Sequence, residues 1–248
     1  MHKIDIPGWA VARVKSRRGK VHVFDDLVPA RTALIVVDMQ NCFMLDEIAH
    51  GVIPESREIV SNVNRLAAAI RAAGGLVCFT QMVITELSLQ DRSVFHNMLS
   101  TPELRDRRIA ALRDPLGHKL YAGLDVRPED VVVQKTNLSA FIQGSSDMEE
   151  ILRRRGIDTI VVTGTITNVC CESTARDGSM RNFKAIMVSD ANASRTDEEH
   201  NAALTGFYIT FGDVMSTDEV IACVARNAAA QDAIPSASSV SRAPAAAV

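Results

Sequence analysis

The chain has 248 residues, of which 47% are hydrophobic and 23% are charged, and its formal net charge is −3. This balance is typical of a globular α/β domain and excludes a globally disordered, collagen-like or coiled-coil chain. Because there is no excess of basic residues, nucleic acid is not an expected partner. Apolar runs such as residues 33–37 are far shorter than the ~20 residues needed to cross a bilayer, so no membrane partner is expected either.

The pattern along the chain predicts three parts. Residues 1–30 form an N-terminal extension, in which Trp9 is a candidate anchor to the domain body or to a neighbouring subunit and a basic cluster at 13–20 is expected to be solvated. Residues 31–227 form one domain. Residues 228–248 consist mostly of Ala, Ser and Pro, and this composition predicts a disordered tail.

Within the domain, short continuous apolar runs alternate with helix-like segments. Continuous hydrophobicity is typical of strands that are buried on both faces. The expected strands are 33–37, 76–80, 130–134, 159–163, 184–188 and 213–216. The expected helices are 55–73, 101–113, 146–155, 168–181, 196–208 and 217–229. This alternation predicts a doubly wound, Rossmann-like α/β/α fold with a parallel sheet and helices on both faces.

Five cysteines are present, an odd number with no C-x-x-C pair: Cys42, Cys78, Cys170, Cys171 and Cys223. The first 20 residues lack the apolar core of a signal peptide. Both observations favour a reduced, cytoplasmic protein.

Functional side chains are expected at the carboxyl ends of the strands, because sites of open parallel sheets lie there. Asp38, Lys135 and Gly164 occupy such ends. After Gly164 comes a turn and then Cys170, near the start of the next expected helix. A helix N-terminus lowers the pKa of a thiol and offers free N–H groups to an oxyanion, so Cys170 is a candidate nucleophile. Local sequence alone leaves a buried structural cysteine equally open, and Cys171 is expected to face the core.

A nucleophilic thiol needs a proton acceptor. None of the six histidines follows a strand, and His96 is expected to be an isolated loop or surface residue. Asp38 and Lys135 are therefore the candidate partners: the aspartate would take the thiol proton, and the lysine would favour the ionised forms of both.

Three segments together resemble the isochorismatase-like cysteine hydrolase superfamily over roughly residues 30–225: ALIVVDMQNCF (33–43), VVVQKTNLSAF (131–141) and VVTGTITNVCCESTARDG (161–178). The resemblance implies a six-stranded, mainly parallel sheet and assembly into homodimers or homotetramers. It implies a catalytic triad of Asp38, Lys135 and Cys170. It also implies a cis peptide between Thr165 and Ile166, and an oxyanion hole made by the backbone N–H groups of Ile166 and Cys170.

The resemblance further implies hydrolysis of a C–N bond in a small amide or N-carbamoyl substrate through a thioester, because isochorismatases proper lack the cysteine. Nicotinamidases of the superfamily carry a metal-binding Asp-x-His pair, whereas residues 80–89 read TQMVITELSL, so neither a metal nor another cofactor is expected. The subgroup most resembled hydrolyses ureidoacrylate and related carbamoyl amides. Residues 82–84 and Cys171 depart from its pattern, which leaves N-carbamoylsarcosine-like and maleamate-like substrates open.

The pocket is less well defined by the sequence. The candidate wall residues are Phe43, Gln81, Asn137, Phe141 and Asn41. The candidate partners of a substrate carboxylate are Arg92, Arg105 and Arg107, and Arg176 is expected to be structural. Two other functions stay open: a thiol or redox protein that uses Cys170 and Cys171, and a non-catalytic α/β module that binds an anion at the 164–170 turn.

Overall fold

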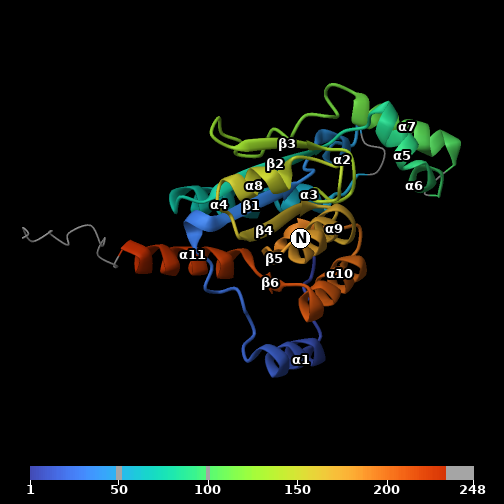
Figure 1. Cartoon of the computed structure of the whole chain (residues 1–248). Coiled ribbons are helices and arrows are strands. Elements are labelled where there is room, and N and C mark those ends of the chain that lie inside the picture. The colour runs from blue at the N-terminus through green and yellow to red at the C-terminus, as the bar shows by residue number, and fades with distance from the viewer. Residues whose placement is uncertain (49–51, 99–100, 233–248) are drawn as a thin grey trace, which may run out of the picture.

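The computed structural model describes residues 1–48, 52–98 and 101–232, with side chains up to residue 230 (Figure 1). Its centre is a sheet of six strands: β1 (Thr32–Val37), β2 (Leu76–Met82), β3 (Val131–Lys135), β4 (Thr159–Thr165), β5 (Lys184–Ala193) and β6 (Asp213–Met215). The strand order is β3-β2-β1-β4-β5-β6, and every neighbouring pair is parallel. The expected α/β fold is confirmed, and the sheet is wholly rather than mainly parallel.

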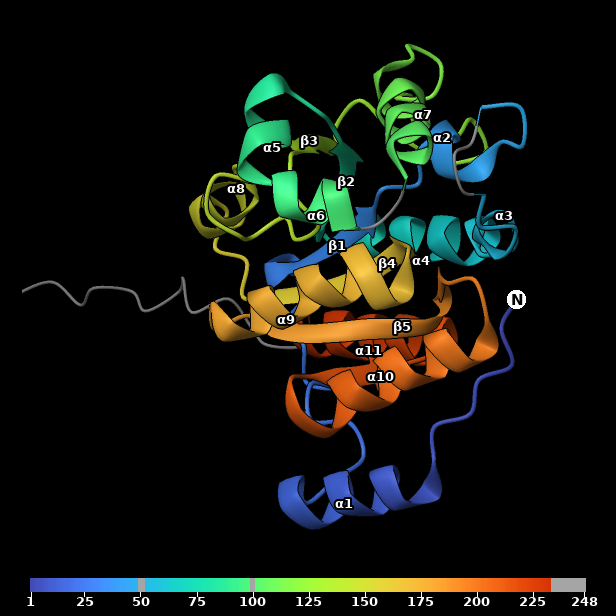
Figure 2. The ribbon, with the colours of Figure 1, turned by 90° about the vertical axis from the view of Figure 1, so that its right-hand side faces the viewer.

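The central strand β1 is buried on both faces, as its continuous apolar run predicted. Leu34 and Val36 face one core, which α4 (Val60–Ala72) and α11 (Thr217–Asp232) cover. Ile35 and Val37 face the other core. That core is covered by α8 (Met148–Arg154), α9 (Glu172–Met180) and α10 (Asp197–Thr210), as Figure 2 shows. Alternating side chains of one strand thus hold both helical layers.

Several helices differ from the expected ones. The helix expected at 55–73 is divided into α3 (Glu55–Glu58) and α4, with the buried Ile59 between them. The helix expected at 168–181 begins with a π-helical segment, η2 (Thr167–Cys171), before α9. A short 3₁₀ segment, η1 (Pro29–Arg31), precedes the first strand. The long connection between β2 and β3 carries α5 (Glu86–Asp91), α6 (Ser93–Met98) and α7 (Pro102–Arg113), and α2 (Asn41–Met44) follows β1.

The N-terminal extension contains a helix, α1 (Gly8–Arg18), that the pattern did not predict. It contacts α10, and its buried residues are Ala10 and Val14. Trp9 is 56% exposed, so it does not anchor the extension to the described part of this chain. The basic cluster is not wholly solvated, because Arg18 donates a hydrogen bond of 2.8 Å to the carbonyl oxygen of Gly212.

At the other end, α11 continues to Asp232, so residues 228–232 of the expected disordered tail are helical. Residues 233–248 of that tail lie outside the described residues. None of the helices within the described ranges has both the length and the apolar character of a membrane span.

Candidate active site

Asp38, Lys135 and Cys170 come together at one end of the sheet. Asp38 follows β1, Lys135 ends β3, and Cys170 lies in η2 just after β4. Because these strands are parallel, their carboxyl ends meet at the same edge. Lys135 Nζ lies 2.7 Å from Asp38 Oδ2, and both side chains are buried. We call these three residues the Asp-Lys-Cys cluster.

Asp38 is held by Thr80, a residue of β2. The Thr80 hydroxyl donates a 2.7 Å hydrogen bond to Asp38 Oδ1, and its oxygen accepts a 3.1 Å bond from the Asp38 N–H. The backbone of Asp38 has φ +48°, a left-handed conformation that is uncommon outside glycine but that aspartate tolerates. Sequence reasoning missed Thr80. The sheet order would have indicated it: β2 lies between β1 and β3, so residues near the end of β2 lie between Asp38 and Lys135.

Lys135 is wholly buried, and three oxygens surround its ammonium group. Besides the Asp38 carboxylate, it donates to the carbonyl oxygens of Asn137 at 2.8 Å and Leu138 at 3.0 Å. Burial acts to lower the pKa of Lys135, but the charges of Asp38 and Cys170 outweigh it, and the net shift is upward. The lysine is therefore a fixed cation inside the site.

The Cys170 side chain is only 6% exposed. Burial raises the pKa of its thiol to about 12; Lys135 opposes this shift and Asp38 adds to it. The sequence favoured a lowered thiol pKa from the helix N-terminus, whereas in the folded chain loss of solvation shifts the pKa upward. A nucleophilic Cys170 must lose its proton as it attacks.

The turn that carries Cys170 has three unusual features. The peptide between Thr165 and Ile166 is cis, at the bond that the resemblance indicated. The Ile166 carbonyl oxygen accepts hydrogen bonds from the N–H groups of Val169 and Cys171, which flank Cys170. Gly164 has φ +111°, and a Cβ atom there would lie 2.2 Å from the Val37 carbonyl oxygen. Only glycine therefore lets β4 approach β1 closely enough to place this turn beside Asp38.

Beside Cys170 is a cavity of about 260 Å³. Its lining combines apolar side chains with a small number of cationic and polar ones: Phe43, Met82, Ile84, Arg92, Phe95, His96, Arg108, Leu112, Leu138, Thr165, Ile166, Val169, Cys170 and Arg195. Of the five expected wall residues, Phe43 lies in this lining.

The other four expected wall residues lie outside that lining because their side chains are engaged elsewhere. The amides of Gln81 and Asn41 donate to the carbonyl oxygens of His118 and Leu116. The Asn137 side-chain oxygen accepts a hydrogen bond from the Leu138 N–H. Phe141 packs in the core, with its ring centroid 5.4 Å from that of Phe183.

Among the expected carboxylate partners, Arg92 lines the cavity, whereas Arg105 and Arg107 do not. Arg108, the next residue along α7, does. The expectation for His96 is wrong, because it is 3% exposed and lines the same cavity. The position of His96 depends on how α6 and α7 pack together, and no local sequence pattern indicates that packing.

Two other residues are placed as expected. Arg176 Nε donates to Glu172 at 2.8 Å, one turn earlier on α9, and its guanidinium lies 4.1 Å from the centroid of the Phe211 ring. Cys171 is buried, and its thiol faces the carbonyl oxygen of Thr163 at 3.8 Å. Both side chains therefore serve the packing of α9 and β4.

The geometry agrees with the family to which the sequence is similar. A family model described as the isochorismatase domain matches residues 32–219. The chain belongs to the isochorismatase family. The match spans every strand of the sheet and all three residues of the Asp-Lys-Cys cluster.

Individual members of the family give closer comparisons. The ureidoacrylate amidohydrolase RutB of Pseudomonas savastanoi pv. phaseolicola is 34% identical over 232 residues, which cover 87% of this chain and 91% of that protein. A cysteine hydrolase from Pseudomonas syringae pv. phaseolicola superposes with a TM-score of 0.69 and 31% identity, over 82% of this chain and 96% of the other. The N-carbamoylsarcosine amidase of Thermoplasma acidophilum superposes with a TM-score of 0.60 and 26% identity, over 76% and 97% of the two chains.

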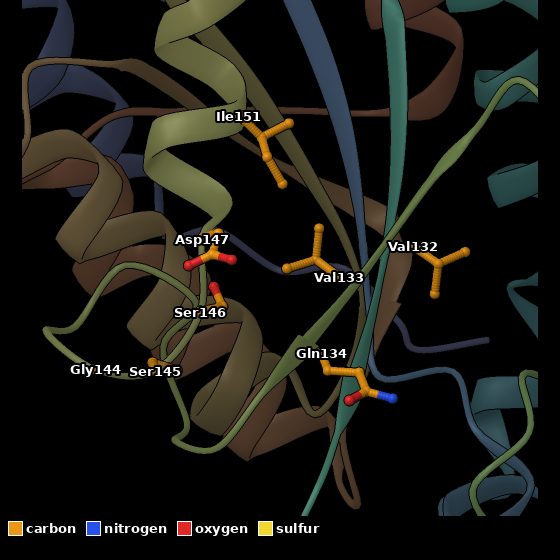
Figure 3. A pocket seen from close by; sticks show the side chains of 8 residues that line it. All are labelled: Val132, Val133, Gln134, Gly144, Ser145, Ser146, Asp147 and Ile151. Carbon is orange, nitrogen blue, oxygen red and sulfur yellow. The ribbon is translucent and has the colours of Figure 1, made fainter.

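A second hollow, of about 490 Å³, lies between β3 and α8 (Figure 3), and no residue of the Asp-Lys-Cys cluster lines it. Ser145 and Ser146 line it, but their hydroxyls donate to the carbonyl oxygens of Ser139 and Ala140. No cysteine lines this hollow, so it offers no thiol nucleophile comparable to Cys170. Within the residues that the structure describes, this member of the family has no group of three or more His, Cys, Asp and Glu side chains arranged to hold a metal ion.

Proposed function

We propose that this protein is a cysteine-dependent amidohydrolase that cleaves a C–N bond of a small amide or ureido compound. The observation that carries the proposal is the buried Lys135–Asp38 ion pair, which acts electrostatically on the Cys170 thiol beside the 260 Å³ cavity. The similarity to a ureidoacrylate amidohydrolase and to an N-carbamoylsarcosine amidase supports the choice of bond.

The proposed reaction begins with Cys170. Its sulfur attacks the amide carbonyl carbon while Asp38 takes the thiol proton, so no free thiolate has to form at neutral pH. Because burial raises the pKa of the Cys170 thiol to about 12, the proton has to move to Asp38 during the attack. The resulting oxyanion is held by the N–H groups of Ile166 and Cys170, which lie where the first turn of η2 leaves amides without intrahelical acceptors.

Collapse of the tetrahedral species breaks the C–N bond, and Asp38 gives its proton to the departing nitrogen. The product, ammonia or an amine, leaves an acyl thioester on Cys170. Water then attacks the thioester carbonyl while Asp38 takes a proton from it, and the thiol is restored as the acid departs. Lys135 keeps one positive charge beside Asp38 throughout, which stabilises the aspartate whenever it is ionised.

The test is release of ammonia from ureidoacrylate, N-carbamoylsarcosine, maleamate, nicotinamide and biuret by the wild type and by Cys170→Ala. We expect turnover of at least one ureido or amide acid and background rates in the variant. Asp38→Asn should lower kcat by about 10²–10⁴-fold, as loss of a general acid–base does. Cys171→Ala is the matched control, because this neighbouring thiol faces the core. Full activity in Cys170→Ala would refute the mechanism.

No observation favours the two alternative functions. A redox role would require Cys171 to reach solvent or a partner thiol, yet it is wholly buried and all five cysteines are free. A non-catalytic anion-binding module would not need the buried lysine–aspartate pair. Assembly into a homodimer or homotetramer and a cytoplasmic location remain predictions from the sequence.

A further inference from the structure

The cavity beside Cys170 has one strongly cationic side. It is formed by Arg92 at the end of α5, His96 of α6 and Arg108 of α7. We call these three residues the arginine wall. Helices α5, α6 and α7 lie together beyond one end of the sheet (Figure 1). They belong to the long connection between β2 and β3, and none of the three wall residues takes part in the proposed bond cleavage.

The two arginines of the wall are not neutralised by the protein. In the described parts of the chain, no carboxylate forms an ion pair with Arg92 or Arg108, whereas Arg105 and Arg113 of α7 each have one. Arg92 donates instead to the carbonyl oxygen of Thr136 at 2.8 Å. Both guanidinium groups lie over the Phe95 ring, 4.5 Å and 5.2 Å from its centroid.

The surroundings also deprive these cations of water. Burial lowers the pKa of both Arg92 and Arg108. The pKa of a guanidinium group is normally so high that both side chains stay charged at neutral pH. Arg92 also lies close enough to interact electrostatically with Cys170. Two partly desolvated positive charges without a counter-ion therefore face the space in which a substrate of Cys170 would lie. Such a site favours an anion strongly.

His96 adds a directed hydrogen-bond donor. Its Nδ1 lies 2.6 Å from Nη2 of Arg108. A guanidinium can only donate, so Nδ1 must accept, and the proton of the neutral imidazole is then on Nε2. Burial and the neighbouring charges of Arg108, Arg92 and Arg105 lower the pKa of His96, which keeps the ring neutral. The Nε2–H group is buried, and within the described residues it has no hydrogen-bond partner.

We propose that the arginine wall binds a carboxylate of the substrate, with Arg92 and Arg108 supplying the charge and His96 Nε2–H a third hydrogen bond. This inference rests on the proposed amidohydrolase function and specifies its substrate class: short amides or ureido compounds that carry a free carboxylate away from the bond to be cleaved. The volume of about 260 Å³ lies at or below the small end of ordinary ligand pockets and suits a molecule of this size. The apolar side chains of Phe43 and Leu112 in the same lining would contact the short chain between the two groups.

The first test compares each acid with its own neutral ester, namely maleamate and N-carbamoylglycine with their methyl esters. In the wild type kcat/KM should be higher for the acids. Arg92→Gln and Arg108→Gln should each lower the acid-to-ester ratio by about 10–100-fold, mainly through KM, as loss of a charged hydrogen bond does. Arg108→Lys should have a higher acid-to-ester ratio than Arg108→Gln, because lysine keeps the positive charge. Arg107→Gln, an exposed arginine of the same helix that does not line the cavity, is the control.

The outcomes of this test separate the two proposals. If turnover depends on Cys170 but the acid-to-ester ratio is the same in the wild type and in both Gln variants, the carboxylate inference is overturned and the hydrolase stands. If Cys170→Ala retains full turnover, the proposed function fails. A charge preference that survives in Arg107→Gln and disappears in Arg108→Gln supports the inference.

A second test needs no turnover. Iodoacetate and iodoacetamide alkylate the same thiol and differ in a carboxylate, so the ratio of their rates at Cys170, located by mass spectrometry of the fragmented peptide, reports the charge preference of the cavity. We expect Arg92→Gln and Arg108→Gln to lower the iodoacetate-to-iodoacetamide ratio about tenfold, and Arg107→Gln to leave it unchanged. An unchanged ratio in both wall variants would overturn the inference. A Cys170 that reacts with neither reagent, in a protein that also turns over no member of the amide panel, would overturn both proposals.

Discussion

Cys170 of the Asp-Lys-Cys cluster lines the same cavity as the arginine wall, but the cluster and the wall are supported in different ways. The cluster stands on the ends of parallel strands, and its charges neutralise each other at 2.7 Å in a fully buried setting. The residues of the wall belong to α5, α6 and α7, and the first two of these helices have six residues each. The positive charges of the wall have no acidic partner in the described chain. Under the proposed function, the sheet positions the reacting groups, while the connection between β2 and β3 supplies the residues that select the substrate.

This difference has an energetic consequence. A change within the cluster leaves a buried charge unpaired and should cost both activity and stability. A change in the wall breaks no ion pair of the folded protein, so it should alter selectivity and lower the free energy of unfolding by less than a change in the cluster does. The predictions that follow test this contrast, first in the cluster and then in the residues around it.

The largest effect is expected for Lys135→Met. Removing the ammonium group leaves the buried Asp38 carboxylate without its counter-ion, so unfolding should become easier by about 3–5 kcal/mol and turnover should be lost. Denaturant titration measures the first quantity and ammonia release the second. Lys184→Met is the control, since the Lys184–Asp26 pair is 3.3 Å long and at the surface, and it should change stability by less than about 1 kcal/mol.

A double variant makes the same prediction sharper. If the cost of Lys135→Met is the unpaired charge, Asp38→Asn in that background should restore part of the stability, so the two substitutions should not be additive. Additive costs would show that Lys135 stabilises the fold through packing alone, and the contrast between cluster and wall would lose its electrostatic basis.

The next effect concerns the support behind the Cys170 turn. His200 of α10 is buried; its Nδ1 lies 2.9 Å from the Thr167 hydroxyl and its Nε2 lies 2.9 Å from the Ser189 carbonyl oxygen. Burial, together with the nearby His2, lowers the pKa of His200 from 6.5 to about 4. The unfolded chain therefore binds a proton between these values and the folded chain does not. Stability should be full above pH 6.5 and fall by up to about 3 kcal/mol as the pH drops to 4.

Chemical denaturation at a series of pH values measures this dependence. His200→Gln keeps one donor and one acceptor but cannot titrate, so its stability should fall less steeply over the same interval. An equally steep fall in His200→Gln would show that other groups carry the acid sensitivity.

A smaller effect is expected for Gly164→Ala. The added methyl group would meet the Val37 carbonyl oxygen, and the backbone at φ +111° is unfavourable for alanine. Thermal and denaturant unfolding should show a loss of about 1–3 kcal/mol, as in other overpacked sites, with a drop in kcat because β4 moves away from Asp38. Gly8→Ala is the control: it lies in α1 with open space around it and should be neutral or stabilising. Unchanged kcat in Gly164→Ala would mean that the close approach of β1 and β4 does not position Cys170.

The same contrast explains which parts of the molecule could be predicted from the sequence. Strands buried on both faces leave continuous apolar runs, and a residue directly after such a run must lie at the sheet edge, so Asp38 and Lys135 could be located by chain position alone. His96 lies in α6, which has only six residues, and Arg108 lies in α7, whose apolar residues do not gather on one face. No local period therefore indicates how these helices pack, and the proposed shared role of the two residues appears only when α6 and α7 meet.

Two errors in the sequence-based interpretation have the same physical origin. The thiol pKa of Cys170 was expected to fall because the helix terminus is visible in the local sequence, whereas burial, which raises it, is a property of the assembled fold. Phe141 was expected in the cavity wall because it follows a motif that contains Lys135, but its ring turns into the core toward Phe183. Local sequence places the backbone of such a segment; the direction of a side chain depends on its tertiary neighbours.

The smallest effect is expected for Thr80→Val, which tests how much of the cluster's order depends on one hydroxyl. Valine has nearly the same shape, so packing is preserved, but Asp38 loses the donor to Oδ1 and the acceptor of its N–H. Because one carboxylate oxygen is left without its hydrogen bond, stability should fall by about 1–2 kcal/mol and kcat by roughly tenfold, with little change in KM. Thr163→Val is the matched control: that threonine is also buried in the sheet, but its hydroxyl makes only a 3.4 Å contact with the Ile35 carbonyl oxygen. Equal losses in the two variants would mean that Thr80 contributes as an ordinary buried threonine and does not position the aspartate.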